Sequence, residues 1–221
     1  MTDNATLKKW SDIYGRQRSV GAPGWASADS YRLKQNRIVE ALSEHQVLPD
    51  ATFLELGCGA GNIALWMALR GFTAFGVDII QKAIEWAADN AAEASLSAQF
   101  VMANAAEMPM FQNEQFDIIF DSDCFHMITG HNRAICFREV YRVLKSGGLM
   151  IAGGNVRDES LSGPTAKCIR TPDGLEYMLY SETELLQELS DAGFRVLCVK
   201  HHPKRGSNKI VRDCIAIHAT R

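Results

Sequence analysis

The distribution of apolar residues along the chain predicts alternating strands and helices. One apolar helix face recurs at Ile80, Ala83, Ile84, Ala87, Ala88 and Ala91. Short apolar runs bounded by glycine, proline or polar residues instead predict buried strands. These signals place strands at 53–56, 73–78, 99–102, 116–121, 149–152, 194–200 and 210–218, and helices at 31–44, 63–70, 80–91, 132–144 and 182–192. Such alternation is typical of a doubly wound α/β domain.

Two stretches lack this regularity. Before residue 31, aromatic residues alternate with glycine and proline, which predicts an irregular segment. Aromatic rings are costly to leave in water, so residues 1–48, which include the predicted helix at 31–44, are expected either to form a helical lid over a pocket or simply to dock on the core. The main domain is then expected over 49–221. Residues 155–179 are predicted to be a loose connection, serving either substrate recognition or no specific role.

A glycine-rich turn follows the first predicted strand. Gly57, Gly59 and Gly61 let the backbone adopt positive φ, and the following helix points its positive end at the turn. The spacing is G-x-G-x-G rather than the G-x-G-x-x-G of dinucleotide sites, and the chain has no Gly-Lys-Ser/Thr phosphate loop. Glu55 precedes the turn and would repel pyrophosphate. The turn therefore favours a ligand with positive charge.

The run E-L-G-C-G-A-G at residues 55–61 resembles motif I of the class I S-adenosylmethionine-dependent methyltransferases. R-V-L-K-S-G-G at residues 142–148 is similar to the family's R-V-L-K-P-G-G, with Ser146 in place of proline. The resemblance is specific over residues 53–153. It implies a Rossmann-like, seven-stranded, mostly parallel sheet with an antiparallel last strand. The implied cofactor, S-adenosyl-L-methionine, carries a sulfonium and an ammonium but no phosphate, and its product is S-adenosyl-L-homocysteine.

The resemblance also assigns a cofactor site. Asp78 ends the second strand about twenty residues after the turn, where a carboxylate can accept hydrogen bonds from ribose hydroxyls, although an acid favoured by a helix dipole is the alternative. Asn104 replaces the family's usual aspartate, yet its amide oxygen can still accept from the adenine amino group. The expected cofactor-binding residues are Glu55, Gly57, Cys58, Gly59, Gly61, Asp78, Ile79, Asn104, Ala105 and Asp121.

Residues 122–128 follow the fourth strand and are expected to form the floor of the reaction site. Methyl transfer needs positioning, exclusion of water and, for some acceptors, removal of a proton. His126 is the first candidate base because histidine titrates near neutrality, and Asp123 is the second. His126 could instead be a wall residue, and Asp121 or Asp123 could anchor the cofactor ammonium. Cys124 is interpreted as a buried thiol rather than a nucleophile.

The aromatic residues of the N-terminal segment, Trp10, Tyr14 and Trp25, are expected to contact the acceptor. Asp121, Asp123 and Asp158 could hold Mg²⁺ as in catechol-type enzymes, but nothing in the sequence fixes their geometry, and no metal is expected. The six cysteines occur singly without a C-x-x-C pair, so no zinc site or disulfide scaffold is signalled. Without a signal peptide or a membrane-spanning apolar stretch, the protein is expected to be cytoplasmic and to have no membrane partner.

The predicted function is methyl transfer to an O, N or S atom of a small molecule, by a monomer or homodimer that resembles thiopurine- and tellurite-type enzymes. One alternative is an RNA or protein methyltransferase. A second is a non-catalytic cofactor-binding relative, and a nicotinamide oxidoreductase is a distant third. The net charge of −3 argues against a nucleic-acid partner. A basic cluster could serve such a partner or be a solvated turn: Lys200, His201, His202, Lys204, Arg205, Lys209 and Arg212.

Overall fold

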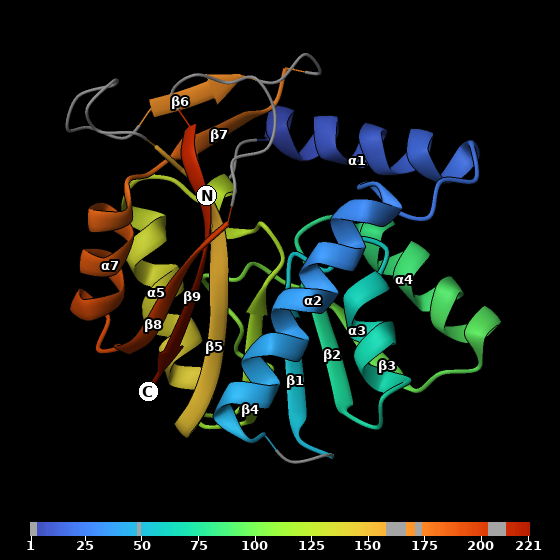
Figure 1. Ribbon diagram of the computed structural model, residues 1–221. Helices are drawn as coiled ribbons and strands as arrows, with labels where there is room; N and C mark the ends of the chain where they lie inside the picture. The colour runs from blue at the N-terminus through green and yellow to red at the C-terminus, as the bar shows by residue number, and fades with distance from the viewer. Residues whose placement is uncertain (1–3, 48–49, 158–166, 171–173, 203–210) are drawn as a thin grey trace.

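A seven-stranded sheet forms the centre of the computed structural model, which describes residues 4–47, 50–157, 167–170, 174–202 and 211–221. The strand order is β3-β2-β1-β4-β5-β9-β8 (Figure 1). All neighbouring pairs are parallel except those made by β9, which runs antiparallel to both β5 and β8. The predicted Rossmann-like sheet with its antiparallel last strand is therefore confirmed. The strands are β1 (Thr52–Leu56), β2 (Thr73–Asp78), β3 (Ala98–Met102), β4 (Phe116–Asp121), β5 (Leu144–Arg157), β8 (Arg195–His202) and β9 (Val211–Thr220).

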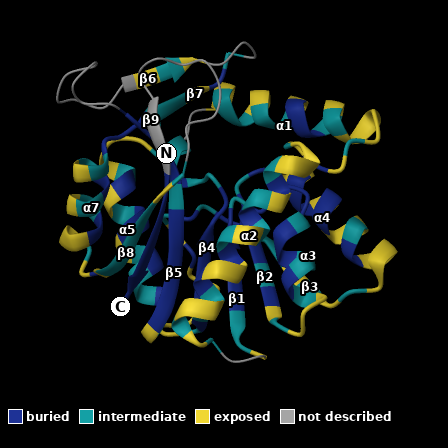
Figure 2. Ribbon diagram, in the orientation of Figure 1, coloured by how far each residue is buried: buried dark blue, intermediate teal, exposed yellow. Residues whose placement is uncertain are grey.

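Helices cover both faces of the sheet because successive strand residues point to opposite sides. In β1, Phe53 packs into an apolar cluster with α2 (Ala28–His45) and α3 (Asn62–Ala68). The next residue, Leu54, packs into a second cluster with α5 (His131–Val143) and α7 (Glu182–Asp191). Figure 2 shows the resulting buried centre between exposed helix surfaces. Within the described residues, every helix is too short or too polar to cross a membrane.

The expectation of an irregular segment before residue 31 is wrong for most of its described length, although residues 20–27 are irregular as expected. Residues Asn4–Ser19 form a regular helix, α1, despite Gly15 in its middle. Its Tyr14 packs with Trp86 of α4 (Gln81–Ala94), so tertiary burial outweighs the weak helix propensity of glycine. A 3-10 turn, η1 (Phe125–Met127), follows β4.

The expectation of a loose connection over residues 155–179 is wrong for most of the described residues in that range, and its residues 158–166 and 171–173 lie outside the described part of the chain. Strand β5 continues to Arg157, and β6 (Lys167–Arg170) pairs antiparallel with β7 (Glu176–Leu179) as a separate two-stranded sheet. Strand β5 also begins at Leu144, directly after α5, so Gly147 and Gly148 lie within the strand and do not end the helix. Figure 1 shows β6, β7 and α1 together above the sheet. The Lys9 ammonium of α1 donates to the backbone carbonyl of Gly174, 2.9 Å away, just before β7.

Gly61 allows α3 to begin directly after the turn. It has φ +78°, and an added Cβ would lie 2.7 Å from the Phe100 ring and 3.0 Å from the Ala87 methyl. We expect Gly61→Ala to lower the free energy of unfolding by about 2–4 kcal/mol, from left-handed strain plus overpacking. The control is Gly71→Ala, where φ is +93° but nothing lies within 4 Å. Denaturant titrations should show only about 1–2 kcal/mol lost in the control; equal losses would contradict the packing argument.

Candidate active site

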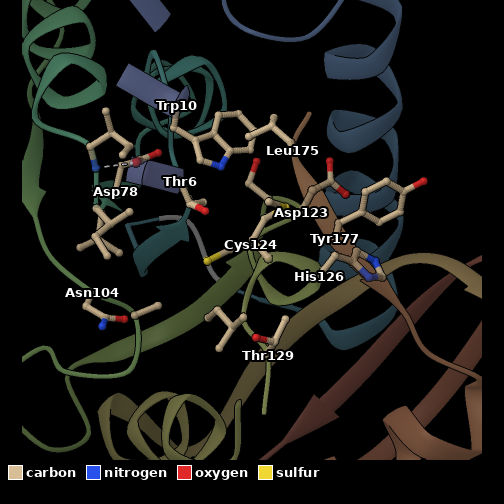
Figure 3. Close-up of a pocket in the computed structure, with 18 of the residues that line it drawn as sticks. Thr6, Trp10, Asp78, Asn104, Asp123, Cys124, His126, Thr129, Leu175 and Tyr177 are labelled. Carbon is tan, nitrogen blue, oxygen red and sulfur yellow. Dashed lines mark hydrogen bonds between the residues drawn. The ribbon is translucent and has the colours of Figure 1, made fainter. Parts of the chain in front are cut away.

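A cavity of about 500 Å³ lies at the carboxyl ends of β1, β2 and β4, and residues of α1 and β7 also line it. This volume falls within the range of roughly 300–1,000 Å³ that is typical of small-ligand sites. In Figure 3, Asp78 and Asn104 lie on one side of the cavity and Leu175, Tyr177 and His126 on the other. Asp123 and Cys124 lie between them. One cavity therefore contains two chemically different walls.

The first wall is built around the carboxylate of Asp78. Its Oδ2 accepts hydrogen bonds from the Gly59 amide at 3.0 Å and the Tyr14 hydroxyl at 3.2 Å, and its Oδ1 accepts from the Ile80 amide at 2.9 Å. Burial raises the pKa of Asp78, and these hydrogen bonds oppose the rise. Burial also raises the pKa of Tyr14 well above its usual value, so the phenol remains a donor. Asp78 thus fixes the glycine turn, α4 and α1 to one another at the cavity wall.

Two predicted cofactor carboxylates lie behind the cavity surface. The buried Glu55 accepts from the Ala64 amide in the first turn of α3 at 2.9 Å. Asp121 Oδ1 accepts from the amides of Cys124 and Phe125 at 2.8 and 3.0 Å. Desolvation raises the pKa of both carboxyls to about 7. These groups shape the turn and the floor from below and do not line the cavity.

Lys34 of α2 supplies a buried positive charge to this floor. Its ammonium donates to Ser122 Oγ and lies 2.9 Å from Asp123 Oδ2. The charge lowers the pKa of Asp123 and opposes the raised pKa values of Glu55 and Asp121. Lys34 could not be identified from the sequence, because it lies 88 positions from Ser122 and no local pattern marks it. It fastens the N-terminal helices to the loop after β4.

His126 lies in the second wall. Its Nδ1 is 3.1 Å from the Met178 carbonyl, which can only accept, so Nδ1 carries the proton. Its Nε2 faces Gly154 so closely that a Cβ there would lie 1.9 Å away. Burial lowers the pKa of His126, which keeps the ring neutral. These contacts match the wall-residue alternative that the sequence left open.

The structure brings most of the predicted site residues to the cavity. Those lining it are Trp10, Tyr14, Trp25, Gly57, Asp78, Ile79, Asn104, Ala105, Asp123 and His126. Cys58, Gly59 and Gly61 belong to the turn but do not line the cavity, like Glu55 and Asp121. Asn104 Oδ1 already accepts from the Ala106 amide at 3.0 Å. Further lining residues were not singled out from the sequence, although the last four lie within 155–179, for which substrate recognition was one alternative: Thr6, Thr129, Asn132, Asn155, Leu175, Glu176 and Tyr177.

The missed residues Glu176 and Tyr177 could have been found. The Pro172-Asp173-Gly174 signal between two short segments is a hairpin pattern, and a hairpin following the fifth strand would return to the cavity.

The aromatic residues of the segment before β1 form a connected group. The Trp10 ring meets Trp25 edge to face with centroids 5.4 Å apart, and its centroid is 5.8 Å from that of Tyr14. This group gives the cavity an aromatic cover.

Two sequence hypotheses fall partly outside the described residues. Asp158 of the suggested magnesium set lies there, as do Lys204, Arg205 and Lys209 of the basic cluster and the side chain of Arg212. Within the described part, the Lys200 ammonium pairs with Glu40 and Glu44.

Residues 54–152 match the methyltransferase domain family. Over these residues, which include the glycine turn and Asp78, the chain is similar to a methyltransferase domain. An uncharacterized methyltransferase of Synechocystis sp. is 31% identical over 103 residues, which cover 47% of this chain and 46% of that protein. A ubiquinone biosynthesis O-methyltransferase of Pseudomonas savastanoi pv. phaseolicola is 28% identical over 110 residues, 50% of this chain and 47% of that protein. The chain thus spans about half the length of these curated relatives.

A solved structure extends the likeness of the methyltransferase domain to nearly the whole chain. The 1,6-didemethyltoxoflavin-N1-methyltransferase of Burkholderia thailandensis, solved with 1,6-didemethyltoxoflavin and S-adenosylhomocysteine, has a TM-score of 0.75 at 19% identity. The match covers 98% of this chain and 88% of that one. At this identity the comparison shows a shared fold. The likeness to thiopurine- and tellurite-type enzymes stays a prediction.

Proposed function

We propose that this protein transfers a methyl group from S-adenosylmethionine to an O, N or S atom of a small-molecule acceptor. The main support is that a single cavity has Asp78 on one side and an aromatic wall on the other, with room for an acceptor between them. The names of the Pseudomonas and Burkholderia relatives, an O- and an N-methyltransferase of small molecules, support this class of acceptor.

The first wall would hold the cofactor. Asp78 would accept from the ribose hydroxyls, Asn104 and Ala105 would face the adenine, and the backbone at Gly57 would meet the amino-acid part. When bound, the cofactor supplies a methyl group on a sulfonium, whose sulfur is an activated leaving group. The chain therefore mainly has to position the acceptor and exclude water. Trp10 and Trp25 line the same cavity as Asp78. They would cover the reacting groups as part of a lid formed by residues 1–48.

The acceptor would bind between Asp123 and the β7 side of the cavity. Tyr177 and Leu175 offer apolar surface there, and Glu176 offers a carboxylate. Asp123 lines the same space, and its paired Lys34 keeps it ionised at neutral pH. Between the two predicted bases, we therefore place Asp123 ahead of His126, whose ring nitrogens face the Met178 carbonyl and Gly154.

This order of the two candidate bases predicts different kinetics. For an acceptor that must lose a proton, Asp123→Asn should lower kcat by roughly 100- to 10,000-fold, the usual contribution of general base catalysis. His126→Gln should lower kcat by less than about 10-fold, because glutamine can still donate to the Met178 carbonyl. Steady-state kinetics of the two variants decide the matter. A larger loss in the histidine variant would reverse the assignment.

The proposed function is tested by measuring S-adenosylhomocysteine release across a panel of phenols, heteroaromatic amines and thiols. Release that requires one acceptor class supports the proposal. Tight cofactor binding without release for any class would favour the non-catalytic alternative. Release only with RNA or protein, weakened by salt, would favour the macromolecular alternative.

A further inference from the structure

We propose that Glu44, His45, Cys198 and His218 form a binding site for a transition metal ion of the zinc class. The four residues come from the end of α2 and from the β8–β9 pair. None of them lines the methyl-transfer cavity. The site would be structural rather than catalytic.

The geometry of the cluster is close to that of a tetrahedral site. One ligand atom from each residue lies within 4.8 Å of all the others. His218 Nδ1 is 3.1 Å from His45 Nε2, 3.2 Å from Cys198 Sγ and 3.7 Å from Glu44 Oε2. Zinc bonds of about 2.0–2.1 Å to nitrogen and about 2.3 Å to sulfur give tetrahedral edges of roughly 3.3–3.6 Å. Small side-chain adjustments would therefore accommodate an ion.

The fold fixes this arrangement from two directions. Cys198 and His218 are direct cross-strand partners of β8 and β9, so their side chains share one face of the sheet. The α2 helix ends at His45, whose ring meets the His218 ring edge to face with centroids 5.2 Å apart. Sequence spacing could not signal the site, because its ligands come from positions 44, 45, 198 and 218.

Hydrogen bonding alone does not explain why His45, Cys198 and Glu44 all approach the same nitrogen of His218. Its Nδ1 can make one in-plane hydrogen bond, yet three polar groups approach it. The ring is fully buried, and its Nε2 has no hydrogen-bond partner among the described residues. A metal ion at Nδ1 would bind one atom from each of the four residues at once.

The donor set selects the kind of metal. Two imidazoles, one thiolate and one carboxylate suit Zn²⁺, whereas Ca²⁺ and Mg²⁺ prefer oxygen ligands, of which only Glu44 provides one. The Lys200 ammonium donates to the other oxygen of Glu44 and so holds that carboxylate in orientation without contacting the ion. Binding forms four metal–ligand bonds and releases the Cys198 thiol proton to water, without any redox change.

The ion would tie α2 to the last two strands. Lys34, eleven residues before His45 on the same helix, contacts the cavity floor about 16 Å further along the helix axis. With four protein ligands no coordination position stays open, which is the pattern of structural zinc sites. Metal binding would therefore stabilise the docking of the N-terminal helices.

The test titrates the purified, metal-free 221-residue chain with Co²⁺ and Zn²⁺. We expect one ion per chain, visible tetrahedral Co²⁺ bands with a thiolate-to-cobalt charge-transfer band, and displacement of Co²⁺ by Zn²⁺. Zinc at about a hundred times its Kd should raise the thermal midpoint by roughly 5–10 °C. No uptake of either ion by the folded chain would overturn the proposal.

Substitutions locate the ion. Cys198→Ser should abolish the charge-transfer band. Cys198→Ser and His45→Ala should each weaken binding by at least about 100-fold, since changing only a group that hydrogen-bonds to a metal ligand already costs up to that much. The matched controls are Cys168→Ser and His131→Ala, at exposed positions away from the cluster, and they should bind as the wild type does. Unchanged binding in either cluster variant, with circular dichroism showing an intact fold, would overturn the proposal. Because no cofactor or acceptor is used, these results are independent of the proposed methyl transfer.

Discussion

Asp78→Asn should weaken S-adenosylmethionine binding by roughly 100- to 1,000-fold. A ribose hydroxyl that donates to the acceptor site left on this charged carboxylate is worth about 1.5–3 kcal/mol, and an amide removes the charge and turns one acceptor into a donor. That new donor would also face the Gly59 amide or the Tyr14 hydroxyl, which now donate to Asp78. The amide oxygen can still accept from the Ile80 amide, so the start of α4 should survive.

Calorimetric titration of the cofactor measures this loss. The control is Asp89→Asn, which removes a carboxylate whose pairing with Arg18 is exposed to solvent. The control should bind the cofactor with wild-type affinity. Equal affinities for the wild type and the Asp78 variant would exclude Asp78 from ribose recognition.

Lys34→Met should lower the free energy of unfolding by about 3–5 kcal/mol near pH 8.5, because it leaves buried carboxylates without their cation. The loss should be smaller near pH 5.5. Glu55 and Asp121 have pKa values of about 7, so at the lower pH both are largely neutral. Removing Lys34 raises these pKa values further, and a raised folded-state pKa costs stability as pH rises. The deficit of the variant should therefore widen above about pH 7.

Denaturant unfolding of both proteins across this pH range provides the measurement. Lys145→Met is the matched control, because Lys145 pairs with the half-buried Asp117 at a partly exposed site. That pair should contribute no more than about 1 kcal/mol. A Lys34 deficit that stays constant, or shrinks, above pH 7 would show that the ammonium does not balance buried carboxylates.

The sheet and the Asp78 wall could be predicted from sequence because their signals are local. Consecutive apolar residues such as Phe53 and Leu54 indicate a strand buried on both faces. Asp78 is the last residue of the next strand, and this position predicts that it lies beside the glycine turn. The helix at 4–19 could not be predicted, since it depends on Tyr14 packing against α4, a contact between distant segments.

The electrostatics of the floor also depend on distant contacts. The sequence shows that Glu55 and Asp121 are acidic, but not that both are fully buried and share the cation of Lys34. The proposed order of the two candidate bases differs from the sequence prediction for the same reason. His126 follows a strand end, as a base would. Its Nδ1, however, hydrogen-bonds the Met178 carbonyl of β7, and its Nε2 lies against Gly154 of β5.

Isothermal titration calorimetry of the wild-type chain with S-adenosylmethionine and S-adenosylhomocysteine tests the central claim most directly. The cavity predicts saturable binding of each at one molecule per chain, with mutual competition. Absence of heat with both, together with saturable binding of a nicotinamide dinucleotide or another phosphorylated nucleotide, would contradict it.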